Sequence, residues 1–468
     1  MFSIQRIFFL LVLFAWSKPT LCQVDKKVIF SAEAFIQQLR VNHPVAKQAN
    51  VQVAIAAAEL LSARGGFDPL INMDASRKTF DGKNYYNYSN PELKIPTPFA
   101  IELKTGLENN GGNFLNSEVT SGPSSYLGVD VPLAKGLMMD RRRAVLQQAK
   151  IFRNQSEQER LVILNDLLFD AYTAYGQWAG TFQLYSIYSK FVDVANNRLR
   201  LVRIAYKNGD RAAIDTAEAL AQVQSYELQQ YDALLQLNNA IFELSNYCWL
   251  PNDIPYLLPA QYAPDSIEFA NTIAPPALEQ LLGEAATQNP LIRAYLFKLS
   301  SLEVERRLKF QSLLPTVNLN ANLLNRDYFV LKGADAMLLQ NNYKWGLQFK
   351  LPLFLREGRG EYRKAQLKIK EANWEIANKR WQIDNKIKTY YNENILLQQQ
   401  LLTTLAIYNN YAALLRNEEL KFSQGESSLF LVNTRETKFL EILEKQVELR
   451  IKYFKARYAI EWAAGRLQ

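Results

Sequence analysis

Several segments of the chain alternate between apolar and polar residues, the pattern of a β-strand whose two faces differ. Their apolar members are Ile71, Met73 and Ala75; Phe99, Ile101 and Leu103; Leu127, Val129 and Val131; Val317, Leu319 and Ala321; and Tyr343, Trp345, Leu347 and Phe349. Each segment is about nine residues long, enough for a tilted strand to cross a bilayer. The other face is hydrophilic, like the wall of a water-filled lumen. These features favour a membrane β-barrel over a β-sandwich with a dry core. Four or five strands cannot close a wide barrel, so closure needs several copies.

Two long segments show helical periodicity instead. Residues 141–208 contain no proline, and 361–424 form the matching segment later in the chain. In the first segment, apolar and aromatic residues recur in steps of three and four at Ala171, Tyr175, Trp178, Phe182, Tyr185, Tyr188, Val192, Ala195, Leu199, Val202 and Ala205. This spacing is close to the coiled-coil repeat, and such a helix would be roughly 100 Å long. Gly209 and Gly425 predict sharp turns at the ends, because glycine readily adopts the left-handed conformation that terminates a helix.

The chain contains an internal repeat. Four pairs of landmarks occur in the same order in each half: His43-Pro44 and Asn289-Pro290, Pro69 and Pro315, Pro132 and Pro352, and Gly209 and Gly425. The separation is the same for the first two pairs and shorter for the last two, so the first half has a longer segment between its second and third landmarks. The order and spacing indicate a tandem duplication.

Each repeat is expected to have the order helix, strands, long helix, turn and returning helix. The first repeat, 23–248, is predicted to have a helix over about 31–64, strands over about 67–135, a long helix over 141–208 and a returning helix over 212–248. The second, 277–468, is predicted to have a helix to 312, strands over about 315–355, a long helix over 361–424 and a returning helix over 427–465. Six prolines within 249–276 predict an irregular connector between the repeats.

The N-terminus has the three-part layout of a secretory signal peptide over residues 1–22. Arg6 precedes a short apolar run, and the small residues Thr20 and Cys22 lie two apart at its end. The formal net charge of +8 is mild for 468 residues. Because no dense basic cluster is interleaved with aromatic residues, the charge indicates a solvated surface rather than a nucleic-acid interface.

With these features together, the sequence resembles the TolC-like outer-membrane factor family over residues 31–467. The resemblance is carried by the helix starts at Pro44 and Pro290, the strand-to-helix turns at Pro132 to Gly136 and Pro352 to Gly358, the turn at Gly209 to Asp215, and its partner at Gly425. It implies a mainly α fold with a membrane β-barrel. Three copies would form a 12-stranded barrel with four strands from each, or a larger one if each copy has more. The longer region around 80–125 departs from the simplest pattern of the family and would hold extracellular loops or longer strands. Their long antiparallel coiled-coil helices would form an α-barrel tunnel across the periplasm.

The resemblance also implies a function. The chain would be the outer-membrane channel subunit of a tripartite efflux pump, in contact with outer-membrane lipid. It would give passive exit to substrates delivered by an inner-membrane transporter and a periplasmic adaptor protein, with no cofactor. The outer component of type I protein secretion has the same architecture and remains an alternative. A non-channel periplasmic coiled-coil adaptor or spacer is the alternative from a different class.

The turns between the long and returning helices are the candidate functional residues. The resemblance places a closed periplasmic tip and its adaptor contact at Gly209, Asp210, Gly425, Glu426, Ser427 and Ser428. Members of the family carry aspartates just past these glycines, forming an acidic gate ring, and Asp215 matches one such position. Leu431 and Thr434 occupy the corresponding positions of the second repeat, where the aspartates are missing. The alternative for Asp215 is an ordinary solvated helix carboxylate.

Other chemistry has little support in the sequence. His43 is the single histidine and precedes a proline at a helix start, where a surface or capping role is expected. If the signal peptide is cleaved after Cys22, Cys248 is the only cysteine that remains, and no second histidine is present to complete a metal site or a nucleophilic pair with it. No glycine-rich phosphate loop occurs, so an enzyme is not expected. The basic run 141–143 and Arg356, Arg359 and Arg363 begin the long helices, where they would contact lipid headgroups or simply be solvated.

Overall fold

The computed structural model describes residues 28–259, 261–328 and 341–467, and the signal peptide expected over 1–22 lies outside them. The described chain is mainly α-helical and contains one six-stranded sheet and two short two-stranded sheets. It divides into two compact units, each built from both repeats. The first comprises Met1–His43, Asp170–Ala274 and Asn394–Ala456; the second comprises Pro44–Phe169, Pro275–Glu393 and Arg457–Gln468.

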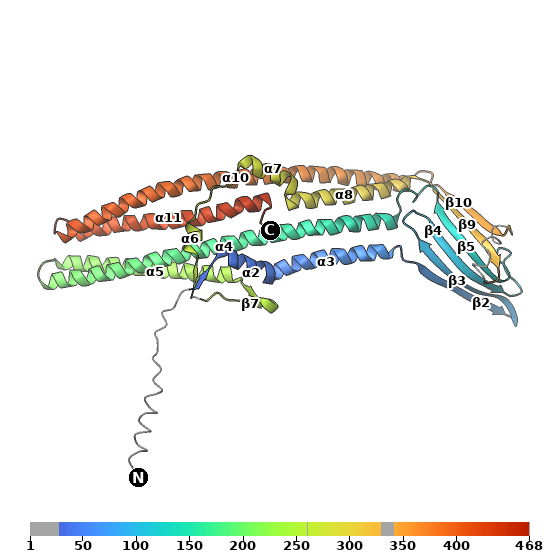
Figure 1. Cartoon of the computed structure of the whole chain (residues 1–468), viewed down its shortest axis with the longest axis horizontal. Coiled ribbons are helices and arrows are strands. Elements are labelled where there is room, and N and C mark those ends of the chain that lie inside the picture. The colour runs from blue at the N-terminus through green and yellow to red at the C-terminus, as the bar shows by residue number, and fades with distance from the viewer. Residues whose placement is uncertain (1–27, 260, 329–340, 468) are drawn as a thin grey trace, which may run out of the picture. The chain divides into compact units, whose positions relative to one another are not determined.

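The second unit contains an antiparallel sheet with the strand order β10-β9-β5-β4-β3-β2 (Figure 1). Its strands are β2 (Leu70–Phe80), β3 (Lys83–Pro96), β4 (Glu102–Gly111), β5 (Gly122–Pro132), β9 (Thr316–Arg326) and β10 (Tyr343–Lys350). The two repeats meet where β5 pairs with β9, with Val129 opposite Ala321. The first repeat supplies four strands and the second two. The sheet thus has two strands more than the four that the resemblance implied, because residues within 80–125 form the hairpin β3–β4.

Helices continue from the sheet within the second unit. They are α3 (Pro44–Gly65), α7 (Leu278–Gln288), α8 (Pro290–Phe310), the first parts of α4 (Arg141–Lys207) and α10 (Arg356–Ser423), and the end of α11 (Leu429–Ala464). Fully buried Leu281, Ile292, Ile387 and Ile460 form one apolar core among them. No helix in the described ranges has both the length and the apolar character needed to cross a membrane.

Prolines divide both opening helices, which were expected to be continuous over about 31–64 and up to 312. The first becomes α2 (Ala32–Asn42) followed by α3, and the second becomes α7 followed by α8. The breaks fall at Pro44 and Pro290, because proline has no N–H to donate and its ring clashes with the preceding turn. Asn289 caps the second break, its side chain accepting a hydrogen bond from the Leu291 amide at 3.0 Å.

The first unit contains the remaining parts of α4, α10 and α11, together with α2 and α5 (Ala213–Ser245). Strand β1 (Val28–Phe30) pairs in parallel with β8 (Tyr262–Pro264). Their neighbours in the proline-rich connector are β6 (Trp249–Leu250), the 3₁₀ turn Pro251–Asp253, β7 (Ile254–Pro255) and α6 (Ser266–Ala270). The connector is therefore ordered by short strands and one helical turn.

An aromatic core holds these segments against α4. Trp178 is 1% exposed and lies edge-on to Tyr175, with ring centroids 5.5 Å apart. The Tyr175 hydroxyl donates to the Phe30 carbonyl at 2.8 Å and accepts from the Asp265 amide at 3.2 Å, so it fastens both β1 and the connector. On the same helix, Gly176 lets the Phe454 ring of α11 approach, since an added Cβ would lie only 2.6 Å from it.

Candidate functional site

One face of the six-stranded sheet is polar. Residues directly opposite in an antiparallel pair share a face, so the strand register places the following side chains together: Asn72, Asp74, Glu92, Lys94, Glu102, Lys104, Asp130, Asn318, Asn320, Asn322, Lys344, Gln348 and Lys350. Lysines and carboxylates are interspersed along this face. It has the composition expected of a surface that contacts water.

The charges on this face are paired, both within a strand and across strands. Lys104 is only 7% exposed, and its ammonium donates to both oxygens of Asp130 at 3.1 and 3.2 Å. Lys94 pairs with Glu92 at 2.9 Å, and the Tyr126 hydroxyl donates to the same carboxylate at 2.6 Å. The polar side chains therefore form an ordered lining in which opposite charges offset one another.

The opposite face is apolar. The register places on it Ile71, Met73, Leu93, Ile95, Leu103, Leu127, Val129, Val131, Val317, Leu319, Leu323, Tyr343, Trp345, Leu347 and Phe349. Many of these side chains are uncovered in the chain, with Ile71 81%, Trp345 64% and Phe349 65% exposed. A broad apolar face of this kind on a single sheet needs a nonaqueous environment or a protein partner.

The two predicted tip turns reverse the chain within the first unit. Gly209 has φ +83° and Gly425 has φ +79°, the left-handed conformation that stops α4 and α10. The amide following each glycine bonds back to the helix, from Asp210 to the Ala205 carbonyl and from Glu426 to the Lys421 carbonyl, both at 2.9 Å. These bonds satisfy terminal helix carbonyls and fix both turns in the same geometry.

The second turn has more side-chain support than the first. The Ser427 hydroxyl donates to Glu418 at 2.5 Å, and Ser428 accepts from the Leu431 amide at 3.4 Å. In the first turn, Ala212 begins α5 with no side-chain cap. The turns also contact each other, because the Arg211 guanidinium lies 4.3 Å from the centre of the Phe422 ring.

The gate candidates occupy the first turns of the returning helices. Within the described chain, the Asp215 carboxylate forms no hydrogen bond or ion pair, and it lies in the first turn of α5, where the helix dipole favours a negative charge. Leu431 is 42% exposed, and Thr434 bonds back to the Phe430 carbonyl at 2.8 Å. Among the described residues, no hydrogen bond or ion pair joins Asp215 to Leu431 or Thr434. A ring that contains all three needs more than one copy.

A buried polar cluster behind the turns was not predicted. Arg198 of α4 donates to both oxygens of Glu436 of α11, at 2.6 and 3.0 Å, and Glu436 is 2% exposed. The Tyr226 hydroxyl of α5 reaches the same carboxylate at 3.1 Å. The Glu419 carboxylate of α10 lies 3.6 Å from Arg198. Burial lowers the pKa of Arg198, but the hydrogen bond and charge of Glu436 outweigh it, so the pKa lies above its usual value.

This cluster joins all four helices behind the turns. Arg198 directly precedes Leu199, an apolar position of the predicted helical repeat. The available signal was a charged residue next to that apolar stripe. Its partner, Glu436, lies in the other repeat and is distant in the sequence.

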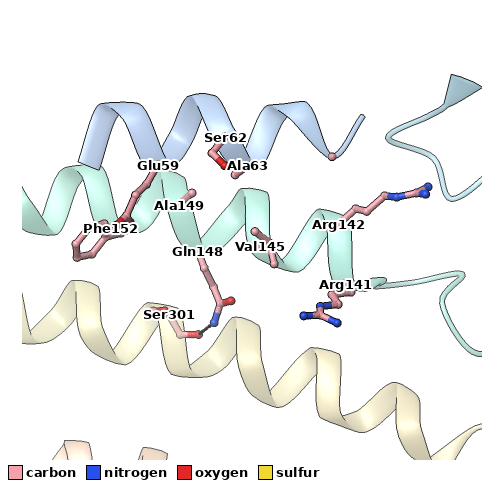
Figure 2. Close-up of a pocket in the computed structure, with 11 residues that line it drawn as sticks. Glu59, Ser62, Ala63, Arg141, Arg142, Val145, Gln148, Ala149, Phe152 and Ser301 are labelled. Carbon is pink, nitrogen blue, oxygen red and sulfur yellow. Dashed lines mark hydrogen bonds between the residues drawn. The ribbon is translucent and has the colours of Figure 1, made fainter. Parts of the chain in front are cut away.

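A groove of about 700 Å³ lies among α3, α4 and α8 in the second unit (Figure 2). Arg141 and Arg142 lie at one end, and Val145 and Ala149 line its apolar middle.

Two arginines of the predicted basic run form ion pairs within the chain. Arg142 pairs with Glu102 at 3.0 Å, and Arg143 pairs with Asp140 at 3.1 Å while donating to the Gly136 carbonyl. These two side chains hold the strand-to-helix connection.

His43 and Cys248, the residues with chemistry that could serve catalysis, are both buried in the fold. His43 is 7% exposed and stacks on Tyr247, so a surface position is wrong, although its amide does cap the end of α2. Cys248 is buried, and burial raises the pKa of its thiol to about 12. A thiol with that pKa is not a nucleophile at neutral pH. Among the described residues, no group of three or more His, Cys, Asp or Glu side chains is arranged to hold a metal ion.

The similarity of this chain to known proteins was found among solved structures. No family model matches the sequence, and no curated protein matches it. Solved structures do match. The CmeC outer membrane channel of Campylobacter jejuni has a TM-score of 0.65 at 16% identity, over 93% of this chain and 85% of that one. The MtrE outer membrane channel of Neisseria gonorrhoeae has 0.65 at 14%, over 93% and 89%. The outer membrane protein VceC of Vibrio cholerae has 0.62 at 15%, over 93% and 96%. The chain therefore has the TolC-like fold of these outer-membrane channels.

Proposed function

We propose that the chain is the outer-membrane channel subunit of a tripartite efflux pump. It would give passive exit to substrates that an inner-membrane transporter and a periplasmic adaptor deliver. The observation that carries the proposal is the two-faced sheet, with paired charges on one face and exposed aliphatic and aromatic side chains on the other. A barrel with the apolar face toward lipid and the polar face toward water satisfies both faces. The TolC-like fold over 93% of the chain supports it.

Membrane fractionation combined with planar-bilayer recording tests the proposal. The protein should be recovered from the outer membrane only with detergent, and the purified protein should form discrete ion-conducting channels. Negative-stain images should show a threefold particle. A monomer released without detergent that gives no conductance would overturn the proposal and favour a periplasmic spacer. In the producing cell, gene deletion should raise retention of small toxic compounds, whereas loss of a secreted protein alone would indicate type I secretion.

We further propose that the two turns at Gly209 and Gly425 contact the adaptor. Exposed apolar side chains flank them, with Ile214 73% and Phe430 65% exposed. A photo-crosslinker placed at exposed Glu426 should capture a periplasmic protein. The same crosslinker at Lys438, farther along α11 and also exposed, should not. Equal capture at both positions would contradict a contact confined to the turns.

For the gate, we propose that Asp215 from each copy contributes negative charge near the turn. In Asp215→Asn the preference of the channel for cations over anions should fall, since a ring of carboxylates raises the local cation concentration. Unchanged reversal potentials in a salt gradient would show that Asp215 is an ordinary solvated carboxylate.

A further inference from the structure

We propose that each copy of this chain contributes six strands to the barrel wall, with β2 of one copy paired to β10 of the next. The inference rests on the proposed channel function. Three copies of the six-stranded sheet would close an 18-stranded barrel, instead of the 12 strands that the sequence resemblance implied. The hairpin β3–β4 is what distinguishes the two assemblies.

The register of β3–β4 makes it part of the wall rather than an external loop. Its apolar residues continue the apolar face of the sheet, because Leu93 lies opposite Ile71 and Leu103 lies opposite Val129. Its charged residues Lys94 and Lys104 lie opposite each other on the polar face. A hairpin that left the wall would have no reason to keep both faces aligned with its neighbours.

Side chains also tie this hairpin to the rest of the polar face. The Tyr126 ring of β5 lies over Gly106 of β4, where an added Cβ would be 2.7 Å from the ring. Its hydroxyl then reaches Glu92 of β3 at 2.6 Å, so one side chain spans three strands. Lys104 of β4 pairs with Asp130 of β5 at 3.1 Å. These contacts are formed only while β3, β4 and β5 remain in one continuous sheet.

The edges of the sheet complement each other in direction. Every neighbouring pair is antiparallel and the sheet has six strands, so its outer strands β2 and β10 run in opposite directions. A β10 edge placed beside the β2 edge of another copy would therefore continue the antiparallel order. Both edges otherwise leave a row of backbone donors and acceptors unpaired, which lipid cannot satisfy.

The side chains of the two edges match as well. Ile71 and Met73 of β2 are 81% and 64% exposed, and Trp345 and Phe349 of β10 are 64% and 65% exposed, all on the apolar face. On the polar face, β2 presents Asp74 and β10 presents Lys344 and Lys350. Apolar residues would thus continue apolar residues, and charged residues would continue the polar face. A second copy of this chain is the partner that offers both edges at once.

Disulfide trapping tests the pairing of β2 with β10. In a Cys248→Ser background, Met73→Cys would be combined in turn with Trp345→Cys, Leu347→Cys and Phe349→Cys, since the register between copies is to be found. At least one combination should give crosslinked dimers and trimers after oxidation in outer membranes. Met73→Cys combined with Leu103→Cys, which lies inside the sheet, should stay monomeric. Absence of crosslinks in every combination, from protein that still forms channels, would overturn the inference; absence of channels would instead overturn the proposed function.

Removal of the hairpin tests its place in the wall. A variant lacking residues 83–111 would join β2 to β5, which also run in opposite directions. Because barrel diameter grows roughly linearly with strand number, the native barrel should be about 1.5 times wider than that of the variant in electron micrographs of detergent particles. Equal diameters would overturn the inference. If the variant does not assemble, the barrel diameter of the native protein still decides between about 12 and about 18 strands.

Discussion

The two repeats agree in backbone plan and differ in the side chains that fill it. Both divide their opening helix at a proline, and both reverse at a glycine with positive φ, +83° at Gly209 and +79° at Gly425. Between these landmarks, the described residues of the first repeat contribute four strands to the six-stranded sheet and those of the second contribute two. Residues that restrict or free the backbone dihedrals are therefore kept in register, whereas the contacts between them have diverged.

Four pairs of equivalent positions show which side chains differ between the two repeats. Counted from the same landmarks, the pairs are His43 and Asn289, Trp178 and Asn394, Arg198 and Leu414, and Ala212 and Ser428. In each of these pairs one repeat has a ring, an ion pair or no cap, and the other has an amide, an aliphatic chain or a hydroxyl. Substitutions at these positions measure how much the side chain found in each repeat contributes to the stability of the protein.

The largest effect is expected at Trp178. Its ring is 1% exposed and packs edge-on to Tyr175 and Phe30. Trp178→Ala should lower the free energy of unfolding by about 3–5 kcal/mol, because it leaves a cavity in an aromatic core that cannot fully collapse. Denaturant unfolding in detergent measures the change. Trp178→Phe keeps part of the volume and should lose clearly less; equal losses would show that packing at this site is not the cause.

The next effect is expected at Glu436. Glu436→Ala should destabilise the protein by about 3 kcal/mol, since it leaves the Arg198 guanidinium, 13% exposed, without its main partner. Removing both charges, as in Arg198→Met with Glu436→Leu, should cost less than Glu436→Ala alone. The substitution at Arg198 places an apolar side chain where the second repeat has Leu414. A double variant as unstable as the single one would mean that the helices require the ion pair itself.

The sequence predicted the backbone plan much better than this cluster. The strands containing Val129 and Leu319 followed from alternation, and the turns followed from Gly209 and Gly425, because those signals are local. Arg198 and Glu436 come from different repeats, so no local pattern pairs them.

Only the first strand of the additional hairpin was difficult to predict, because the alternation that includes Leu103 already indicated the second strand. Its first strand contains the run Tyr85-Tyr86-Asn87-Tyr88, which does not alternate in polarity, and Pro91 interrupts it. The strand exists because β2 and β4 supply partners on both sides. Pairing of this kind is decided by tertiary context rather than by the propensity of the segment.

At Asn394 we expect a change of opposite sign. The side chain is 1% exposed, and within the described residues neither atom of its amide group has a hydrogen-bond partner. Asn394→Leu should raise the free energy of unfolding by about 1–2 kcal/mol, because an unsatisfied buried amide is replaced by an apolar group. Exposed Asn392→Leu on the same helix serves as the control. Destabilisation by Asn394→Leu would indicate that another copy of the chain supplies the missing hydrogen bonds.

A smaller difference is expected between the two caps. Ala212 has the extended conformation of a helix-capping residue, φ −79° and ψ 156°, but no side chain to accept a hydrogen bond. Ala212→Ser should stabilise the start of α5 by about 0.5–1 kcal/mol, and Ser428→Ala should weaken the start of α11 by a similar amount. Hydrogen exchange of the amides at 213–216 and 429–432 measures each helix start separately. If the amides at the start of α11 remain better protected than those at the start of α5 after both substitutions, the caps are not the cause. The difference between the two turns would then come from Arg211 and Ser427.

The smallest effect at neutral pH, and the only one that depends on pH, is expected at His43. Burial lowers its pKa, against a smaller opposing contribution from the backbone of Asn246. The unfolded chain therefore binds a proton more readily than the folded chain, so the stability from neutral His43 is fully present above about pH 6.5 and is lost as the pH falls through the lower folded pKa. Unfolding between pH 7.5 and 5.5 should show declining stability. The decline should be reduced in His43→Asn, which copies Asn289 of the second repeat. An unchanged pH dependence would assign the decline to carboxylates, and the two helix breaks would then be equivalent despite their different residues.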